Sequence, residues 1–509
     1  MTLLRTDGQQ RRAAAWLFLL CVSAYSLTAP GHIWEMDGAS RLQLASRMVD
    51  GFGWTLQPQT EYLGWIVQGT DGRWYSIYGL GQSLAFVPFV VLAEGLSSVY
   101  KVGLSDDRVV KFLASFLNPI EGALLCLVFF FILARHVAYG LRTSLGLSLI
   151  LGFATFLWPN ARDSFDHIQA GLFLYASLLC ILESRRTATA WWGCIGGACA
   201  GFAILTRIDS VLFMPALGIA LVGNPGRPDR PLRDRCFSFL GGMVPFLGFF
   251  ALYNYVRFGN PMETGYGLIF ERDRLPSLGL NVWEGLYRFL LSPGRGLLIY
   301  CPVVLLFFLA IRRFSHRERV LAATCLAVIG AYVGFFSQFG AVSPHAWGPR
   351  QLLPSLPMFL LPVGVLLEGA VRRKVIRAMV WILVASSILA QIPAVATSYV
   401  KPLWQAEMEG ASATDLTFNW HYFAVQRQYA HLLRAVPATF RGDSFAFIGS
   451  GEASPEVLIQ TMITLNIVDW WWLYLYWYGF RWALLPPLGL VGAIGWSIAG
   501  MRRVWKDRD

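Results

Sequence analysis

Long runs of apolar residues recur along almost the whole chain, and short stretches with charged residues separate them. A helix that crosses a bilayer needs about 20 mostly apolar residues, so each long run is a predicted membrane span. The runs lie at 13–30, 110–134, 143–159, 168–184, 188–206, 209–223, 236–256, 296–311, 320–338, 351–369, 378–398 and 483–501. The pattern predicts an all-α polytopic membrane protein with about twelve transmembrane helices.

Two further apolar stretches, 82–98 and 461–480, fit either a membrane span or a helix that lies in the interface. Positive charge decides between these readings, because Lys and Arg concentrate in cytoplasmic loops. If neither stretch crosses, then Arg11 and Arg12, the basic clusters between later spans and the C-terminal Arg502 and Arg503 all fall on the inner side. We therefore predict that both stretches lie in the interface, the second with its aromatic run 469–472.

Composition supports a membrane protein, since 55% of the residues are hydrophobic and only 14% are charged. The net charge of +11 comes from short clusters between apolar runs, which argues against a nucleic-acid partner. The eight cysteines have no CxxC spacing, so neither disulfides nor a thiolate metal site is predicted. The first apolar run lacks a clear cleavage site, and we interpret it as an uncleaved anchor whose N-terminus lies inside.

This topology brings several polar segments to the outer side of the membrane. They are the loops 31–109, 160–167, 257–295 and 339–350 and the segment 399–460. One external site can therefore draw on all of them.

The first of these loops begins with Trp34-Glu35-Met36-Asp37-Gly38 and continues into an amphipathic segment. Apolar residues share one helical face over 38–50, with Arg41 and Arg47 elsewhere, which predicts a helix at the membrane surface. Asp37 at its start either caps that helix or faces water as a general base. Two carboxylates at the mouth of a span are costly unless they face water or a site.

Later in the same loop, Gly69-Thr70-Asp71-Gly72 separates two β-prone runs and predicts a hairpin over the site. Its second arm carries Arg73, Tyr75 and Tyr78. An arginine beside aromatic residues either binds a lipid phosphate or anchors the loop at the interface.

The loop 160–167 carries Asp163, Asp166 and His167 at the mouth of another span. An adjacent Asp and His can ligate a metal, hold a base or donate to a phosphate. Either aspartate can instead cap a helix.

Two turns on the outer side combine glycine with arginine, one at 292–296 with Arg295 and one at 345–350 with His345 and Arg350. Backbone amides and a guanidinium can approach one anion at such a turn, or the arginine can simply anchor the turn. Together the two turns favour an anionic ligand. The segment 399–460 has no metal or nucleophile motif, and it can serve as a lid or an acceptor surface.

The acidic Glu35-Met36-Asp37 motif, the helix 39–49 with Gly51 and Trp54 beyond it, and the second acidic loop at Asp163 and Asp166 resemble the GT-C superfamily of glycosyltransferases. The stretch 37–54 is similar to the opening loop of the protein mannosyltransferase and lipid A aminoarabinose transferase branch. The resemblance covers residues 13–370 at the level of topology, and the first acidic motif is its most specific part.

The resemblance implies a GT-C-like bundle that takes a sugar from a polyprenyl-phosphate donor. It implies that Asp37 is the general base, with Glu35 beside it, and that Asp166 is the second acidic position. Substrate or phosphate contacts are expected from Arg73, Tyr75, Tyr78, His167, Arg295, His345 and Arg350. Because the leaving lipid phosphate is already charged, no cofactor is required and a divalent metal is optional.

The implied organisation is a transmembrane catalytic module over 1–398, a short outer segment with an interfacial aromatic helix over 399–482, and a last span with a basic cytoplasmic tail over 483–509. The protein is then expected in the inner or plasma membrane, with its site on the periplasmic or extracellular face. The large C-terminal domain of oligosaccharyltransferases is missing, which argues against transfer to an asparagine sequon. A glycan, a lipid or a protein hydroxyl remains as the acceptor.

A transporter or flippase of lipid-linked sugars is the main alternative, since it also needs outer arginines and many spans. Transporters often contain an internal repeat and place ionisable groups near mid-membrane. This chain shows no such repeat, and its acidic groups cluster at span mouths. A scaffold without catalysis leaves Glu35, Asp37, Asp166 and His167 together unexplained.

Overall fold

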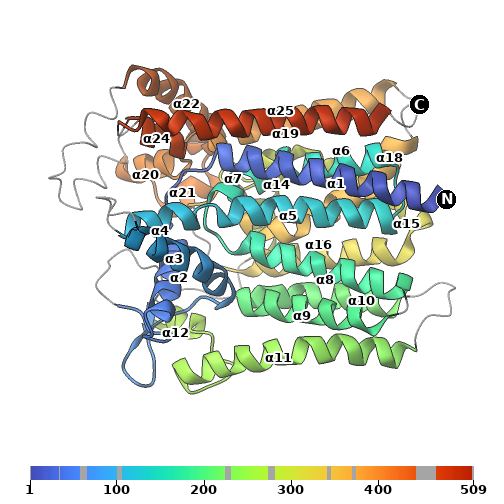
Figure 1. The fold of residues 1–509 in the computed structure, drawn as a ribbon, viewed down its shortest axis with the longest axis horizontal. Coiled ribbons are helices and arrows are strands. Elements are labelled where there is room, and N and C mark those ends of the chain that lie inside the picture. Colours follow the sequence, from blue (N-terminus) through green and yellow to red (C-terminus); the bar gives the residue numbers. More distant parts are fainter. Residues whose placement is uncertain are drawn as a thin grey trace.

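The computed structural model describes residues 2–33, 35–57, 66–99, 106–187, 189–223, 231–272, 281–340, 345–369, 374–442, 466–477 and 479–506. Within these ranges the chain is almost wholly helical, and its sheet has two short strands. The long helices lie side by side, with both termini at one end of the bundle and the short helices gathered at the other (Figure 1). This confirms the all-α polytopic fold.

Helix occupies each of the predicted spans. Seven of the described helices are long and apolar enough to cross a membrane, and three shorter apolar helices coincide with further predicted spans. The spanning elements are α1 (Thr2–Leu27), α5 (Leu117–Phe131) with η1 (Ile132–His136), α6 (Leu141–Phe153), α8 (His167–Thr187), α9 (Ala190–Thr206), η2 (Ile208–Phe213) with α10 (Met214–Val222), α11 (Leu232–Phe258), α14 (Leu297–Tyr300) with η3 (Pro302–Leu305) and α15 (Leu306–Arg317), α16 (Arg319–Gln338), η4 (Arg350–Ser355) with α17 (Leu356–Leu360), η5 (Leu361–Val363) and α18 (Gly364–Gly369), α19 (Lys374–Ala396) and α25 (Leu485–Lys506).

The remaining elements are short and follow or precede the spans. They are α2 (Met36–Val49), β1 (Ile66–Gln68), β2 (Trp74–Ser76), α3 (Gly81–Val99), α4 (Asp106–Ala114), α7 (Leu157–Arg162), α12 (Tyr266–Arg272), α13 (Val282–Leu290), α20 (Val400–Met408), α21 (Ala413–Phe418), η6 (Trp420–Tyr422), α22 (Ala424–Arg441), α24 (Trp471–Trp477) and η8 (Arg481–Leu484). In Figure 1, α2, α3, α4, α12, α20, α22 and α24 lie at the end of the bundle opposite both termini. We call this end the peripheral end.

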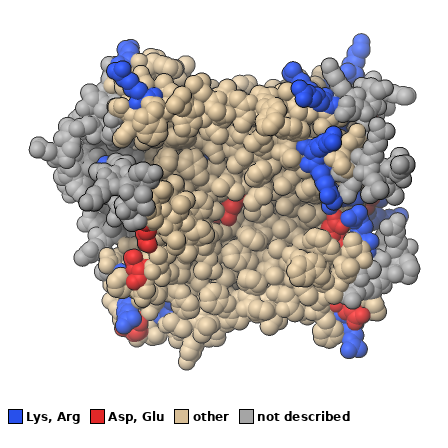
Figure 2. Space-filling view, viewed as in Figure 1, with Lys and Arg blue, Asp and Glu red and all other residues tan. Residues whose placement is uncertain are grey.

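The described parts of the two ambiguous apolar stretches, α3 and α24, belong to the peripheral end (Figure 1). Figure 2 shows charged side chains near both ends of the bundle and a broad, almost uncharged band between them. Such a band is what a lipid-facing surface requires. Parts of several predicted features, namely 62–65, 227–230, 273–274, 372–373, 443–460 and 461–465, lie outside the described residues.

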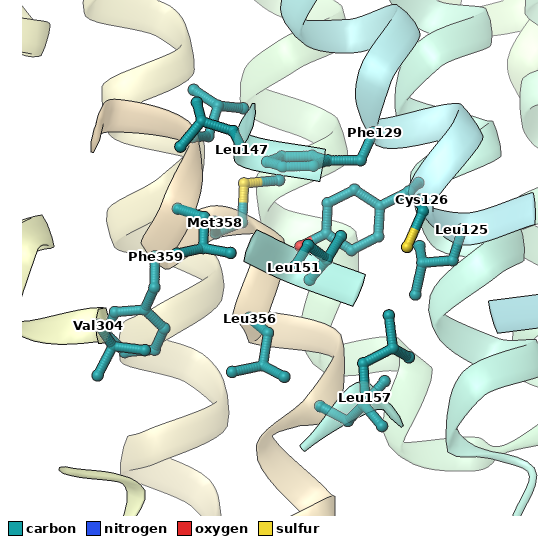
Figure 3. Close-up of a cluster of buried hydrophobic side chains, with 14 of the residues drawn as sticks. Leu125, Cys126, Phe129, Leu147, Leu151, Leu157, Val304, Leu356, Met358 and Phe359 are labelled. Carbon is teal, nitrogen blue, oxygen red and sulfur yellow. The ribbon is translucent and has the colours of Figure 1, made fainter. Parts of the chain in front are cut away.

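The core of the bundle is a continuous cluster of apolar side chains. Figure 3 shows Phe129 of α5, Leu151 of α6 and Met358 of α17 directed into it, together with Leu157 at the start of α7. The loop with Asp163 and Asp166 follows α7 directly, so the packing of α7 in the core fixes the start of that loop.

The predicted hairpin is present, with Val67 opposite Tyr75 in an antiparallel pair. Arg257 at the end of α11 fixes it, because its guanidinium donates to the carbonyl oxygen of Ser76. The amide of Thr70 in turn donates to the carbonyl oxygen of Arg257. The hairpin is thus bonded to the end of α11 through its turn and its second arm.

Asp469 fastens the segment after residue 466 to the bundle. Its carboxylate accepts from Arg162 at 3.0 Å and contacts His32 at 2.8 Å. Burial opposes ionisation, but His32 and Arg162 outweigh it and hold the pKa of Asp469 far below its usual range. The indole N–H groups of Trp471 and Trp472 donate to carbonyl oxygens at the end of α1. The aromatic run, which the sequence predicts to lie at the interface, therefore also attaches this segment to the end of α1.

Candidate active site

A cavity of about 1760 Å³ lies at the peripheral end of the bundle. Its walls come from α2, the loop 163–167, the junction between α9 and η2, α12, the turn 345–351 and the start of α20. These are the outer loops that the sequence predicted to converge. Charged and aromatic side chains share the lining, so the cavity can hold a ligand with a polar head and an apolar body.

Asp37 lies in the first turn of α2, and its side chain is 24% exposed to the cavity. Tyr78 donates a hydrogen bond to Asp37 Oδ1 at 2.5 Å, and Arg350 Nη2 lies 3.5 Å from Oδ2. Burial and the neighbouring carboxylate raise the pKa of Tyr78 well above its usual value, so the phenol keeps its proton and acts as the donor. The side chain of Asp37 is therefore directed at the cavity and at these two groups, and not at the backbone of its own helix.

Asp166 lies deep in the same cavity between two arginines. Its oxygens contact Arg207 Nη1 at 2.6 Å and Arg41 Nη2 at 2.8 Å. Burial raises the pKa of Asp166, but Arg207 and Arg41 outweigh burial and hold the pKa below its usual value. Arg207 also contacts Asp209 at 2.9 Å. Asp166 is thus an ionised carboxylate whose two oxygens are both occupied.

Several cationic groups near these carboxylates have N–H positions without a hydrogen-bond partner in the described part of the chain. Arg350 uses neither Nε nor Nη1, although its guanidinium lies 3.7 Å from the ring centroid of Phe165. Arg295, which is fully buried, donates from Nη1 to Gln351 at 3.3 Å but leaves Nε and Nη2 unused. Neither ring nitrogen of His167 has a hydrogen-bond partner, although Nδ1 lies 3.5 Å from Asp166.

Within the part of the chain that the structure describes, Arg295 makes no ion pair with a carboxylate. Burial, together with the adjacent Arg350, lowers its pKa to about 9. A guanidinium in that state is still charged at neutral pH, and an anion beside it would remove much of the cost of burying it. These arginines therefore favour an anionic ligand.

Glu35 and Asp163 form a second acidic pair on the cavity wall. Burial and the charge of Glu35 raise the pKa of Asp163 well above its usual value, and Tyr399 donates a hydrogen bond to the Asp163 carboxyl. Asp163 therefore holds its proton more tightly than an exposed aspartic acid does. Within the described ranges, no group of three His, Cys, Asp or Glu side chains is placed to hold a metal ion.

Three of the predicted contact residues, Arg73, Tyr75 and Arg295, do not line the cavity, and a fourth, His345, lines it with its imidazole against a glutamate. His345 lines the cavity, but its Nε2 contacts Glu407 at 3.0 Å. Arg73 is 71% exposed on the hairpin and borders a separate hollow with Arg47 and Phe52. Tyr75 is buried in the hairpin and donates to Asp71 at 2.8 Å, so it supports the hairpin and does not line the cavity.

Two site residues were missed in the sequence. Arg41 was placed away from the apolar face of α2 and is fully buried against Asp166 and the Tyr78 ring. Arg207 begins the short connection between α9 and η2, which the predicted topology also places on the outer side. An Arg-Ile-Asp sequence at an outer span mouth was a usable signal for the second residue. Arg41 had no such signal, because its partner is 125 positions away in the chain.

No family model matches this sequence, and no curated protein matches it. Fourteen solved chains are similar in structure. ArnT from Cupriavidus metallidurans bound to undecaprenyl phosphate is 16% identical at a TM-score of 0.49, over 96% of this chain and 77% of that chain. The oligosaccharyltransferase from Archaeoglobus fulgidus in the apo form is 11% identical at 0.48, over 90% and 60%.

Both of these proteins are members of the GT-C superfamily, which the acidic motif of this chain also resembles. Identities of this size and TM-scores below 0.5 leave the function of this chain to be inferred from its own side chains.

Proposed function

We propose that this chain is an integral membrane glycosyltransferase that moves a sugar from a polyprenyl-phosphate donor to a glycan, lipid or protein acceptor on the outer face of the membrane. The observation that carries the proposal is a pairing within one site. Asp37 offers an accessible carboxylate, and the guanidinium of Arg350, 3.5 Å from it, lines the same cavity. Transfer from a lipid phosphate needs a base at the acceptor and cations at the leaving group.

In this mechanism Asp37 takes the proton of the acceptor hydroxyl or amine while the acceptor atom attacks the anomeric carbon. The bond from the anomeric carbon to the phosphate oxygen breaks, and the polyprenyl phosphate leaves with the electron pair. The phosphate gains one negative charge in this step. Arg350 is suited to stabilise that charge because its guanidinium lines the cavity beside Asp37, and the fully buried Arg295 adds a positive field from outside the lining.

Asp166 suits an electrostatic role and not proton transfer, because both of its oxygens already contact guanidinium groups. Its part is to hold Arg207 in the cavity wall and to pair with the fully buried Arg41. Glu35 and Asp163, whose pKa is raised, lie together on the cavity wall, and this pair suits contact with a sugar hydroxyl. His167 also lines the cavity.

The outer-face location rests on charge and on the position of the cavity. The cavity lies at the end opposite both termini, and the basic N-terminal and C-terminal segments are then cytoplasmic (Figure 1). The donor's polyprenyl chain would enter from the lipid beside the cavity.

The test is a panel of polyprenyl-phosphate sugars added to the purified protein in lipid vesicles. One member of the panel should raise the melting temperature and should slowly release its sugar, since water replaces the missing acceptor. A donor at about 100 times its Kd is expected to add about 2.7 kcal/mol to the free energy of unfolding. Movement of intact lipid-linked sugar across the vesicle membrane, without cleavage, would instead identify a flippase.

A further inference from the structure

Gln82 is a fully buried glutamine near the start of α3 that does not line the cavity. Its carboxamide has a partner on each side. The oxygen accepts from Arg41 Nη1 at 3.2 Å, and the nitrogen donates to Asn118 Oδ1 at 3.3 Å. Gln82 therefore joins the arginine of α2 to the beginning of α5.

Asn118 continues the connection. It is buried in the first turn of α5, and its nitrogen donates to the carbonyl oxygen of Phe165 at 2.8 Å. The next residue is Asp166, which contacts Arg41. The contacts thus close a ring through Arg41, Gln82, Asn118, Phe165 and Asp166, which we call the carboxamide circuit.

The direction of every hydrogen bond in the circuit is fixed by its arginine. A guanidinium only donates, so the oxygen of Gln82 must face Arg41 and its nitrogen must face Asn118. The nitrogen of Asn118 must then face the carbonyl oxygen of Phe165. Turning either amide around would place two donors or two acceptors against each other in a buried site, which is strongly unfavourable.

Both groups that contact Asp37 rest on members of this circuit. The Arg41 guanidinium lies 4.2 Å from the ring centroid of Tyr78, and Tyr78 donates to Asp37. The Phe165 ring lies under the guanidinium of Arg350, at 3.7 Å, and Arg350 lies 3.5 Å from Asp37. A shift of Arg41 or of Phe165 would therefore move a neighbour of the carboxylate.

We propose that Gln82 and Asn118 are positioning residues of the site, which act through Arg41 and Phe165 to hold Tyr78 and Arg350 against Asp37. Neither residue touches the substrate. The kinetic consequence rests on the proposed glycosyl transfer, whereas the geometric part does not. An error of about 1 Å in a catalytic contact can cost about a hundredfold in rate, so a circuit outside the cavity can control turnover.

The kinetic test uses Gln82→Met, which keeps the length of the side chain and removes both polar atoms, and Asn118→Leu. Each variant should lower kcat about tenfold while KM changes less than threefold. Because both cut the same circuit, the double variant should lose no more than the larger single loss. Gln428→Met is the control, since Gln428 is a similarly buried glutamine that donates to Thr397, and neither residue lines the cavity or belongs to the circuit. It should keep the wild-type kcat.

A structure of Gln82→Met, by electron cryomicroscopy, is the second readout and needs no activity. It should show the Arg41 guanidinium moved away from Asp166. If the methionine variant does not fold, Gln82→Glu replaces it, since a glutamate at this position cannot donate to Asn118. An unmoved Arg41, a kcat within twofold of wild type, or losses that multiply in the double variant would each overturn the proposal. If wild-type protein transfers no sugar, the proposed function fails, and the position of Arg41 still decides the circuit.

Discussion

Tyr78 donates a hydrogen bond to Asp37 across 41 positions of the chain, from the end of the hairpin to the start of α2. The hairpin itself is held by Arg257, and α2 is held by Arg41. The orientation of the Asp37 carboxylate therefore depends on the hairpin and on α2, which different contacts hold in place. Asp37 therefore does not act as a helix cap, because the side chain of a cap accepts a hydrogen bond from the backbone of its own helix.

Removing that donor should slow the reaction. Tyr78→Phe keeps the ring under Arg41 and deletes only the hydroxyl, so Asp37 loses one of its two orienting contacts. A hydrogen bond to a charged group contributes about 1.5–3 kcal/mol, and we expect kcat to fall at least about tenfold. Steady-state kinetics with the active donor measure this. Tyr75→Phe is the matched control, because the hydroxyl of Tyr75 bonds only to Asp71 outside the cavity, and an equal loss there would contradict the account.

Arg207 should contribute to the stability of the fold in addition to lining the cavity. Arg207→Gln leaves the buried Asp166 with Arg41 alone and leaves Asp209 without its partner. Breaking a buried ion pair from one side costs about 3–5 kcal/mol, so the melting temperature in detergent should fall clearly. Arg186→Gln removes a half-exposed arginine from Glu183, which keeps Arg135 and His136 beside it, and should cost less than about 1 kcal/mol. Similar losses of melting temperature for both variants would show that the buried pairs around Asp166 stabilise the fold no more than the pair at Arg186 does.

Asp163 should make stability depend on pH in a definite direction. Its pKa is raised in the folded protein, so the folded state binds a proton that the unfolded state has released. The stabilisation is complete below the unfolded carboxyl pKa of about 4 and is lost as pH rises through the folded value. Asp163→Asn imitates the protonated carboxyl and can still accept from Tyr399. The variant should therefore gain in melting temperature over wild type as pH rises from 4 to 8, and a constant difference would refute the raised pKa.

Most of the fold could be predicted because a membrane span is a local signal. An apolar run of sufficient length must be helical in lipid, and charge parity then separated α3 and α24 from the spans. The hairpin and α2 were also local, since turn residues at 69–72 and helical periodicity over 38–50 specify them.

The partners within the site were not local. Arg73 looked suited to phosphate by its place on the hairpin, but the hairpin turns its side chain outward. Arg41 was placed off the apolar face of the predicted helix, and only the fold brings Asp166 of the loop 163–167 to it. No sequence pattern marks Gln82 and Asn118, because their role depends on hydrogen bonds between three separate elements. Asp37 was within reach of sequence reasoning because a carboxylate at a span mouth is unusual by itself.

Asp37→Asn tests the central claim most directly. The amide keeps the shape of the carboxylate but cannot take a proton, so transfer from the active polyprenyl-phosphate sugar should fall about a thousandfold or more. The same donor should still raise the melting temperature of the variant, because Arg350, the proposed phosphate contact, is unchanged. Asp71→Asn, on the exposed hairpin, should transfer sugar at the wild-type rate. Transfer by Asp37→Asn within a few-fold of wild type would contradict the account.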